Sequence, residues 1–440
     1  MRMGRSDSAS LTGLLILLFV GTSPVLGQQI YRLGIPQLLI PTDGGADYGE
    51  QIICSSGGSF LAAWISQSSP TTVQVVARIF AANGLPTSDE IAVTPPNESI
   101  EEPPSLARDA AGNFVVVWWD PLAEGPSNAG VRVRMFSSAG VGGTEFPANS
   151  YTAGSQRRPS IAMRQNGDFV VVWAGEGPGA VTGIWKREFN SAGVALGVES
   201  LVETGVNDAP LVGMHPTNDS YVIAWNRNDG DLDVRARRYD AAGAPLAAAF
   251  DVNTSTSGNQ GITGISVDAD GDFVILFSGE GQGDVTGILG QLYGANGTPV
   301  SPEFWVNAVV NGEAYGAVAA FLPSGEFLVA WSIRNPDGRG FAARFSSTGF
   351  RVGATDFPVT QTLGADRNQD VWAVCADGAY TYRIALAERP SSGFNEEFLS
   401  QRLSTGLFAD GFESSDMTAW SASVLTRSRV ELRSEPQSTR

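Results

Sequence analysis

Histidine and cysteine are the scarcest of the chemically versatile residues in this sequence. The 440 residues include one histidine, His215, and two cysteines, Cys54 and Cys375. Zinc sites built from His and Cys, thiol redox centres and Ser-His-Asp triads therefore have almost no side chains from which to form. His215 lies beside a predicted turn, and we expect it to be solvated rather than catalytic.

Charge is also sparse, and it is unevenly divided between the two signs. Only 17% of the residues are charged, against about 25% in an average soluble protein. Because 28 Lys and Arg oppose 46 Asp and Glu, the formal net charge is −18. An acidic chain repels phosphate backbones, so nucleic acid is not an expected partner. The hydrophobic fraction of 42% is large enough for a core and excludes a wholly disordered chain.

The N-terminus has the pattern of an export signal. Arg2 and Arg5 precede an apolar stretch, residues 11–20, that is short for a bilayer span. Val25, Leu26 and Gly27 are the small or apolar residues that signal peptidase recognises before a cleavage site. We therefore predict that residues 1–27 are a signal peptide cleaved after Gly27. An uncleaved membrane anchor is the alternative. No later run is long enough to span a membrane. We therefore expect a secreted or periplasmic protein, in a compartment that permits disulfides.

Beyond this segment, one unit of 52 to 55 residues is repeated seven times. Each copy is marked by an aromatic residue, and these are Phe60, Phe114, Phe169, Tyr221, Phe273, Phe327 and Tyr380. Four positions further on, five copies have tryptophan, the fifth has Phe277 and the seventh has Ile384. Two markers that keep one period indicate a repeat architecture.

Each copy reads as four short strands, typified by residues 160–163, 168–173, 183–189 and 303–307. Asn-Gly or Asp-Gly turns follow the first strand and favour a tight hairpin. The second strand is apolar on both faces and must be covered on both. Seven such sheets packed face to face form an all-β, seven-bladed β-propeller over residues 28–408; a β-solenoid, whose coils are usually shorter, is the alternative.

The chain ends show how such a ring would close. The seventh copy lacks a fourth strand, and residues 35–41 resemble one, so we predict that this N-terminal strand completes the last blade. Cys54 and Cys375 fall on the innermost strands of blades one and seven, which are neighbours across the closure. Either the two cysteines form a disulfide there or they are buried free thiols.

Acidic loops offer the clearest candidate ligand site. The loops between second and third strands share one rim, and their candidate ligand-binding residues are Glu176, Asp229, Asp231, Asp233, Glu280, Asp284 and Asp337. One loop offers alternating oxygen ligands for calcium, from Asn226, Asn228, Asp231 and Asp233, although it lacks the closing Glu of an EF-hand. A solvated acidic loop is the alternative. No other cofactor is expected.

Arginines recur beside the third strand of successive copies. Arg78, Arg134, Arg187 and Arg237 occupy one position, and Gln291 is the fifth in the series. Third strands lie far from a propeller's central channel. We therefore interpret these arginines as packing on aromatic rings and bonding a neighbouring blade, not as an anion site.

Two resemblances accompany these patterns. The repeat, with its GDFVVVW strand, resembles repeats of large secreted bacterial proteins, and its strand layout looks loosely like the NHL-type propeller repeat. Residues 407–420 resemble a short C-terminal motif of secreted Gram-negative proteins, and residues 409–440 as a whole are expected to be this motif and a disordered tail. Neither resemblance supplies a catalytic residue.

Two functions remain. The first is a secreted, monomeric, non-enzymatic scaffold that binds an extracellular glycan, protein or envelope component on its acidic rim. The second is a polysaccharide hydrolase or lyase that uses rim carboxylates as acid and base. Propellers host both classes, so the fold does not decide between them.

Overall fold

The computed structural model describes residues 30–39, 46–69, 72–96, 100, 102–125, 128–255, 258–281, 284–308, 313–334, 338–359, 367–390 and 397–405. Within these ranges the chain forms 28 strands and no helix, so none of them supplies a helix that could cross a membrane. The predicted signal peptide, residues 1–27, and the C-terminal segment, residues 409–440, lie outside the described residues.

The strands form seven four-stranded antiparallel sheets. Blade one contains β2 (Ala46–Cys54), β3 (Phe60–Ser69), β4 (Thr72–Phe80) and β5 (Ile91–Ala92). Blade two contains β6 (Ser105–Arg108), β7 (Phe114–Asp120), β8 (Gly130–Phe136) and β9 (Phe146–Pro147). Blade three contains β10 (Gln156–Met163), β11 (Phe169–Gly177), β12 (Val181–Phe189) and β13 (Ser200–Thr204). Blade four contains β14 (Asn207–Met214), β15 (Tyr221–Asn228), β16 (Leu232–Tyr239) and β17 (Phe250–Asp251).

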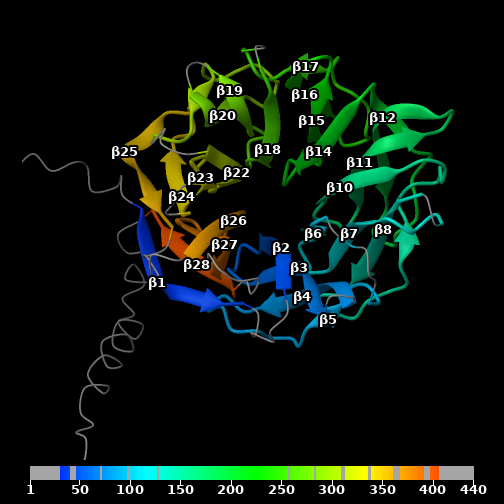
Figure 1. The fold of residues 1–440 in the computed structure, drawn as a ribbon, viewed down its shortest axis with the longest axis horizontal. Helices are drawn as coiled ribbons and strands as arrows, with labels where there is room; N and C mark the ends of the chain where they lie inside the picture. Colours follow the sequence, from blue (N-terminus) through cyan, green and yellow to red (C-terminus); the bar gives the residue numbers. More distant parts are fainter. Residues whose placement is uncertain are drawn as a thin grey trace, which may run out of the picture.

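The remaining blades follow the same plan. Blade five contains β18 (Gln260–Val267), β19 (Phe273–Gly281), β20 (Asp284–Tyr293) and β21 (Phe304–Trp305). Blade six contains β22 (Glu313–Phe321), β23 (Phe327–Arg334), β24 (Gly340–Phe345) and β25 (Arg351–Pro358). Blade seven contains β26 (Arg367–Ala376), β27 (Thr381–Pro390), β28 (Glu397–Ser404) and β1 (Tyr31–Leu38). The blades stand around one axis with β2, β6, β10, β14, β18, β22 and β26 innermost (Figure 1). The predicted seven-bladed propeller is confirmed.

The repeated aromatic residues form the core between blades. Seven buried clusters each combine residues of two neighbouring blades, and the repeated tryptophans, for example Trp173 and Trp225, are fully buried there. Within six blades the first marker stacks on an aromatic of the third strand, as in Phe169 and Phe189, whose ring centroids are 5.0 Å apart. Burying an indole or phenyl ring contributes several kcal/mol, so each marker supports the sheet and its neighbour.

The prediction that Tyr380 is the core aromatic residue of blade seven is wrong. Tyr380 lies in the hairpin with 49% of its surface exposed, whereas Tyr382 is fully buried and occupies the core position. The cause is the turn: Gly378 precedes the core aromatic by four positions, but in the other blades with a Gly turn, such as Gly167 before Phe169, the spacing is two. The hairpin of blade seven is thus two residues longer after its glycine, so the core aromatic residue is Tyr382 and not Tyr380.

Ring closure occurs through the N-terminal strand, as predicted. β1 pairs antiparallel with β28 as the outermost strand of blade seven, so this blade joins both ends of the described chain (Figure 1). The strand spans Tyr31–Leu38 rather than residues 35–41. The backbone bonds of β1 cover an edge of β28 that would otherwise be open.

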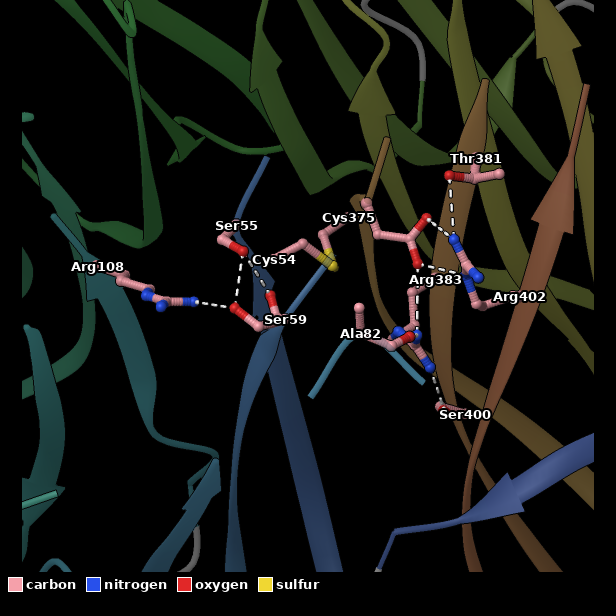
Figure 2. The surroundings of a disulfide bond; sticks show 11 residues. Cys54, Ser55, Ser59, Ala82, Arg108, Cys375, Thr381, Arg383, Ser400 and Arg402 are labelled. Carbon is pink, nitrogen blue, oxygen red and sulfur yellow. Dashed lines mark hydrogen bonds and ion pairs between the residues drawn. A yellow bond between two sulfur atoms is a disulfide. The ribbon is translucent and has the colours of Figure 1, made fainter. Parts of the chain in front are cut away.

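The two cysteines join in a disulfide across the same closure. Cys54 ends β2 and Cys375 lies near the end of β26, with Cα atoms 5.7 Å apart and 321 residues between them in sequence. Beside them, the fully buried guanidinium of Arg383 lies 4.2 Å from the ring centroid of Phe60. It also donates to the Ala82 carbonyl of blade one at 2.9 Å (Figure 2). A covalent bond and a buried cation therefore both connect blade seven to blade one.

That cation is balanced within blade seven. Asp377, whose side chain is also fully buried, pairs with Arg383 at 3.4 Å and with Arg402 at 2.7 Å. Burial lowers the pKa of Arg383 to about 10, while the nearby Asp377 raises it and Arg402 lowers it. The guanidinium thus stays charged at neutral pH.

The repeated arginines connect the blades at their outer part. Arg134, Arg187 and Arg237 each donate to a carbonyl of the preceding blade, at 2.8, 3.0 and 2.7 Å. Arg134 and Arg187 also lie over the rings of Phe136 and Phe189. The interpretation of this series as structural is confirmed for these three residues. Within the blade, the Nε of Arg78, Arg134 and Arg187 donates to a carbonyl nine or ten residues further along the chain, that of Ser88, Gly143 and Gly197.

Candidate functional site

A central channel runs through the ring and provides a wide hollow. It has a volume of about 950 Å³ and is lined by residues of all seven innermost strands. Its walls combine apolar side chains with Tyr48, Tyr315 and Trp372. Wide, partly apolar hollows with a few polar groups are typical of ligand sites.

The entry rim, defined as the face where the innermost strands begin, is shaped by a repeated β-bulge. The pairing of the first two strands shifts near this rim in every blade except the second. Four bulge residues have positive φ: Gly49 at 75°, Arg158 at 51°, Ala209 at 49° and Gly316 at 64°. Bulges redirect side chains and recur beside functional sites.

Four charged residues from three blades meet at these bulges, and we call them the Arg158 cluster: Glu102, Arg157, Arg158 and Asp208. The Arg158 guanidinium lies 3.8 Å from Glu102 through Nε and 3.2 Å from Asp208 through Nη1. Arg157 Nε lies 3.8 Å from Asp208 Oδ1, and the Arg158 backbone N–H donates to Glu102 Oε2 at 3.0 Å. The cluster thus places two carboxylates on one guanidinium at the entry rim, close in sequence to the channel-lining residues Ser105, Ser160 and Leu211.

Burial affects the carboxyl group of Glu102. The side chain of Glu102 is 27% exposed. Desolvation is the largest influence and raises the pKa of Glu102, while the bond from the Arg158 backbone and the charge of its guanidinium lower it and the charge of Asp208 raises it. Burial therefore favours the protonated form of Glu102.

A second polar group lies on the other side of the mouth. The Tyr315 hydroxyl donates to Asp370 of blade seven, and the Arg334 guanidinium lies 4.7 Å from the Tyr315 ring centroid. Arg334 is 66% exposed and pairs with Glu313 at 3.4 Å. A hollow of about 420 Å³ opens between these residues and adjoins the channel, since Tyr315, Arg334 and Asp370 line both. The group offers an aromatic face beside donors and acceptors.

Of the predicted acidic residues, the four whose side chains the structure describes lie on the same rim but apart from one another. Glu176 is half-buried in β11 and packs against Gly154. Asp229 is exposed and pairs with Arg227, and Asp231 is exposed at the same hairpin. Asp233 accepts a bond from Asn253 at 2.7 Å. These side chains bond locally and do not converge on one point.

The candidate calcium ligands are divided between two faces of blade four. Asn226 lies opposite Val234 in the β15–β16 pairing, on the face toward blade five, and its Oδ1 accepts from the backbone N–H of Ile262 at 2.7 Å. Asp233 lies opposite Arg227, on the other face. Asn228 and Asp231 are exposed at the tip. Within the described ranges, no three His, Cys, Asp or Glu side chains gather closely enough to hold a metal ion.

Three predicted residues cannot be placed in the same way. Glu280 and Asp284 belong to β19 and β20, but their side chains lie outside the described part of the structure, as does all of Asp337.

The residues at the channel mouth were not predicted from sequence, although a signal exists. In blades two, three and four a charged residue stands two positions before a proline: Glu102 before Pro104, Arg157 before Pro159, and Asp208 before Pro210. The residue after each proline, which is Ser105, Ser160 or Leu211, lines the channel. The repeated proline, preceded at a distance of two residues by a charge whose sign differs between blades, therefore marks this part of the rim in the sequence. The acidic composition of the hairpins does not mark it.

Comparison with known proteins supports the architecture alone. No protein-family model and no curated protein matches the sequence. A protein of unknown function from Dyadobacter fermentans is similar at 10% identity, with a TM-score of 0.52 over 85% of this chain and 99% of that one. A polysaccharide lyase, an ulvan lyase bound to -[GlcA(1-4)Rha3S]-, is similar at 10% identity, with a TM-score of 0.52 over 84% of this chain and 93% of that one. At such identities the likeness shows the fold, and the chain has the β-propeller fold.

Proposed function

We propose that this protein is a secreted, non-enzymatic binding scaffold whose ligand is a glycan held at the mouth of the central channel. The observation that carries the proposal is the composition of the channel wall, where Tyr48, Tyr315 and Trp372 lie together with the charged residues Asp47, Arg334 and Asp370. Sugars present apolar C–H faces and many hydroxyl groups. Aromatic rings suit the former, and paired donors and acceptors suit the latter.

The location of the site follows from the fold. Loops and strand starts of seven blades meet on the entry rim, and ligands of repeated folds commonly bind where many such segments converge. The predicted signal peptide and the disulfide at the closure are both consistent with an extracellular monomer. The mouth thus takes the place of the hairpin acids as the proposed ligand site, on the same rim.

Titration calorimetry with a saccharide panel tests this function. The panel consists of neutral cello-, xylo-, manno- and arabino-oligosaccharides and of uronate oligosaccharides. We expect at least one to bind the wild-type chain, and Tyr315→Ala to weaken that binding while Asp229→Asn, on an exposed hairpin of the same rim, leaves it unchanged. Absence of binding to every saccharide in the panel would contradict the proposal.

Polysaccharide cleavage is a second candidate, favoured by one observation. Glu102 and Asp208 lie on one guanidinium, at 3.8 and 3.2 Å, and burial raises the pKa of Glu102, as a proton donor requires. The same panel is then assayed for new reducing ends and for the ultraviolet absorbance of unsaturated products. Turnover that is lost in Glu102→Gln would replace the scaffold by an enzyme.

A further inference from the structure

Arg158 has an unfavourable backbone conformation for its residue type. Its φ of 51° is in the left-handed region, which disfavours every residue with a Cβ. The following residue is Pro159, and a residue before proline prefers extended conformations. Blades one and six have Gly49 and Gly316 at the corresponding bulge, where a positive φ has no such cost. The fold therefore accepts glycine at this position.

The contacts of Arg158 do not offset this cost through stability. Its side chain is 48% exposed, and its partners Glu102 and Asp208 are themselves partly exposed. Ion pairs of this exposure contribute little to folding. The hydrogen bond from the Arg158 backbone to Glu102 would remain in a glycine variant. Ala209 has the same strain at the corresponding bulge of blade four, so the backbone conformation by itself does not single out Arg158. What distinguishes Arg158 is its guanidinium, which meets Glu102 and Asp208 and gives this strained position a polar side chain that a ligand can use.

We propose that Arg158, with Glu102 and Asp208, determines the specificity of the glycan site by binding vicinal hydroxyl groups of a neutral sugar. This inference rests on the proposed glycan-binding function. The guanidinium would donate to the two hydroxyl oxygens, and the carboxylates on either side would accept from the hydroxyl hydrogens. Donors and acceptors alternate across the cluster in the order that a diol requires.

Charge decides which class of sugar fits. The Arg158 cluster contains two arginines and two carboxylates, so its formal charge is zero. A uronate or sulfate placed there would gain the arginines but would lie beside Glu102 and Asp208, and like charges at such distances repel. The net charge of −18 adds a repulsive field for any polyanion. A neutral oligosaccharide is repelled neither by these two carboxylates nor by the net charge of the protein.

Two glycine variants separate recognition from strain. Arg158→Gly removes both the strain and the side chain, whereas Ala209→Gly removes the same kind of strain at φ 49° in the next blade and leaves every charged group in place. We expect both variants to melt at or above the wild-type temperature. We expect only Arg158→Gly to bind the neutral oligosaccharide more weakly, by at least about tenfold, as loss of a charged hydrogen-bonding group implies.

The outcomes distinguish this inference from the function on which it rests. If no saccharide binds the wild-type chain, both fail. If a saccharide binds and Arg158→Gly binds it equally well, the specificity role is overturned and the glycan-binding function stands. A melting temperature several degrees lower in Arg158→Gly, or tighter wild-type binding of uronates than of neutral sugars, would also overturn it.

Discussion

The backbone conformation of Arg158 lowers the stability of the fold, while its side chain is the one that we propose to bind ligand. A non-glycine residue in the left-handed region costs about 1–2 kcal/mol, and a partly exposed ion pair returns about 0–1 kcal/mol. Gly49 shows the opposite case, because a Cβ there would lie 3.0 Å from Pro103 as well as requiring a φ of 75°. At that position both the contact with Pro103 and the positive φ favour glycine, whereas at position 158 glycine would be accepted but is not present.

The titration of Glu102 gives an expectation at the same scale. Because burial raises the pKa of Glu102 in the folded chain, the contribution of this residue to stability is complete below the unfolded pKa, near 4.3, and decreases as the pH rises through the folded value. We therefore expect Glu102→Gln to gain in melting temperature relative to wild type between about pH 4 and pH 7. Thermal melts across this range test it, and a growing loss in the variant would mean that Arg158 lowers the pKa instead.

At the scale of strands, the arginine series shows how one residue type connects successive blades. Arg187 donates to the carbonyl of Ala148, in the blade before it, and lies 5.6 Å from the centroid of its own Phe189 ring. In blade five, which has Gln291 in the series, the Tyr293 hydroxyl reaches the Val252 carbonyl at 3.5 Å instead. The corresponding carbonyl of the preceding blade is therefore bonded by side chains from different positions of the third strand.

Removal of one such arginine has a defined expected cost. Arg187→Ala eliminates a charged hydrogen bond between blades, so we expect the free energy of unfolding to fall by about 1–2 kcal/mol. Arg227→Ala is the matched control, since Arg227 pairs with the exposed Asp229, and its loss is expected to cost at most about 0.5 kcal/mol. Urea unfolding of both variants tests this, and equal losses would show that the contact between blades contributes nothing special.

The strands also show why the sequence predicts the fold better than the site. Hydrophobic markers such as Phe169 and Trp173 recur with one period, and packing requires them, so seven blades follow from the pattern. The mouth is assembled from Glu102, Arg158 and Asp208, which are 50 or more residues apart in sequence. Their meeting depends on the bulge and on the closeness of innermost strands, neither of which local composition reports.

The whole molecule depends on a closure that involves both ends of the described chain. β1 completes blade seven, the Cys54–Cys375 disulfide joins that blade to blade one, and Arg383 bonds across the same boundary. A cross-link over 321 residues restricts the unfolded chain strongly. Ring folds without such a closure can open at the first and last blades, where no backbone connects neighbours.

Replacement of both cysteines tests the contribution of this cross-link. We expect Cys54→Ser with Cys375→Ser to lower the free energy of unfolding by about 2–5 kcal/mol, because the unfolded chain regains loop entropy. The wild-type chain kept in reductant is the control and should unfold at the same denaturant concentration as the double variant. An unchanged midpoint in both would show that β1 and Arg383 are sufficient to close the ring.

The central claim is that ligand binds at the channel mouth and not at the acidic hairpins. It is tested most directly by hydrogen–deuterium exchange of the full chain, with and without the panel oligosaccharide that binds most tightly. We expect slower exchange at the starts of the innermost strands, residues 102–106, 156–160 and 313–317, and no change at residues 226–233. Protection confined to residues 226–233 would contradict the account and return the site to the hairpin acids.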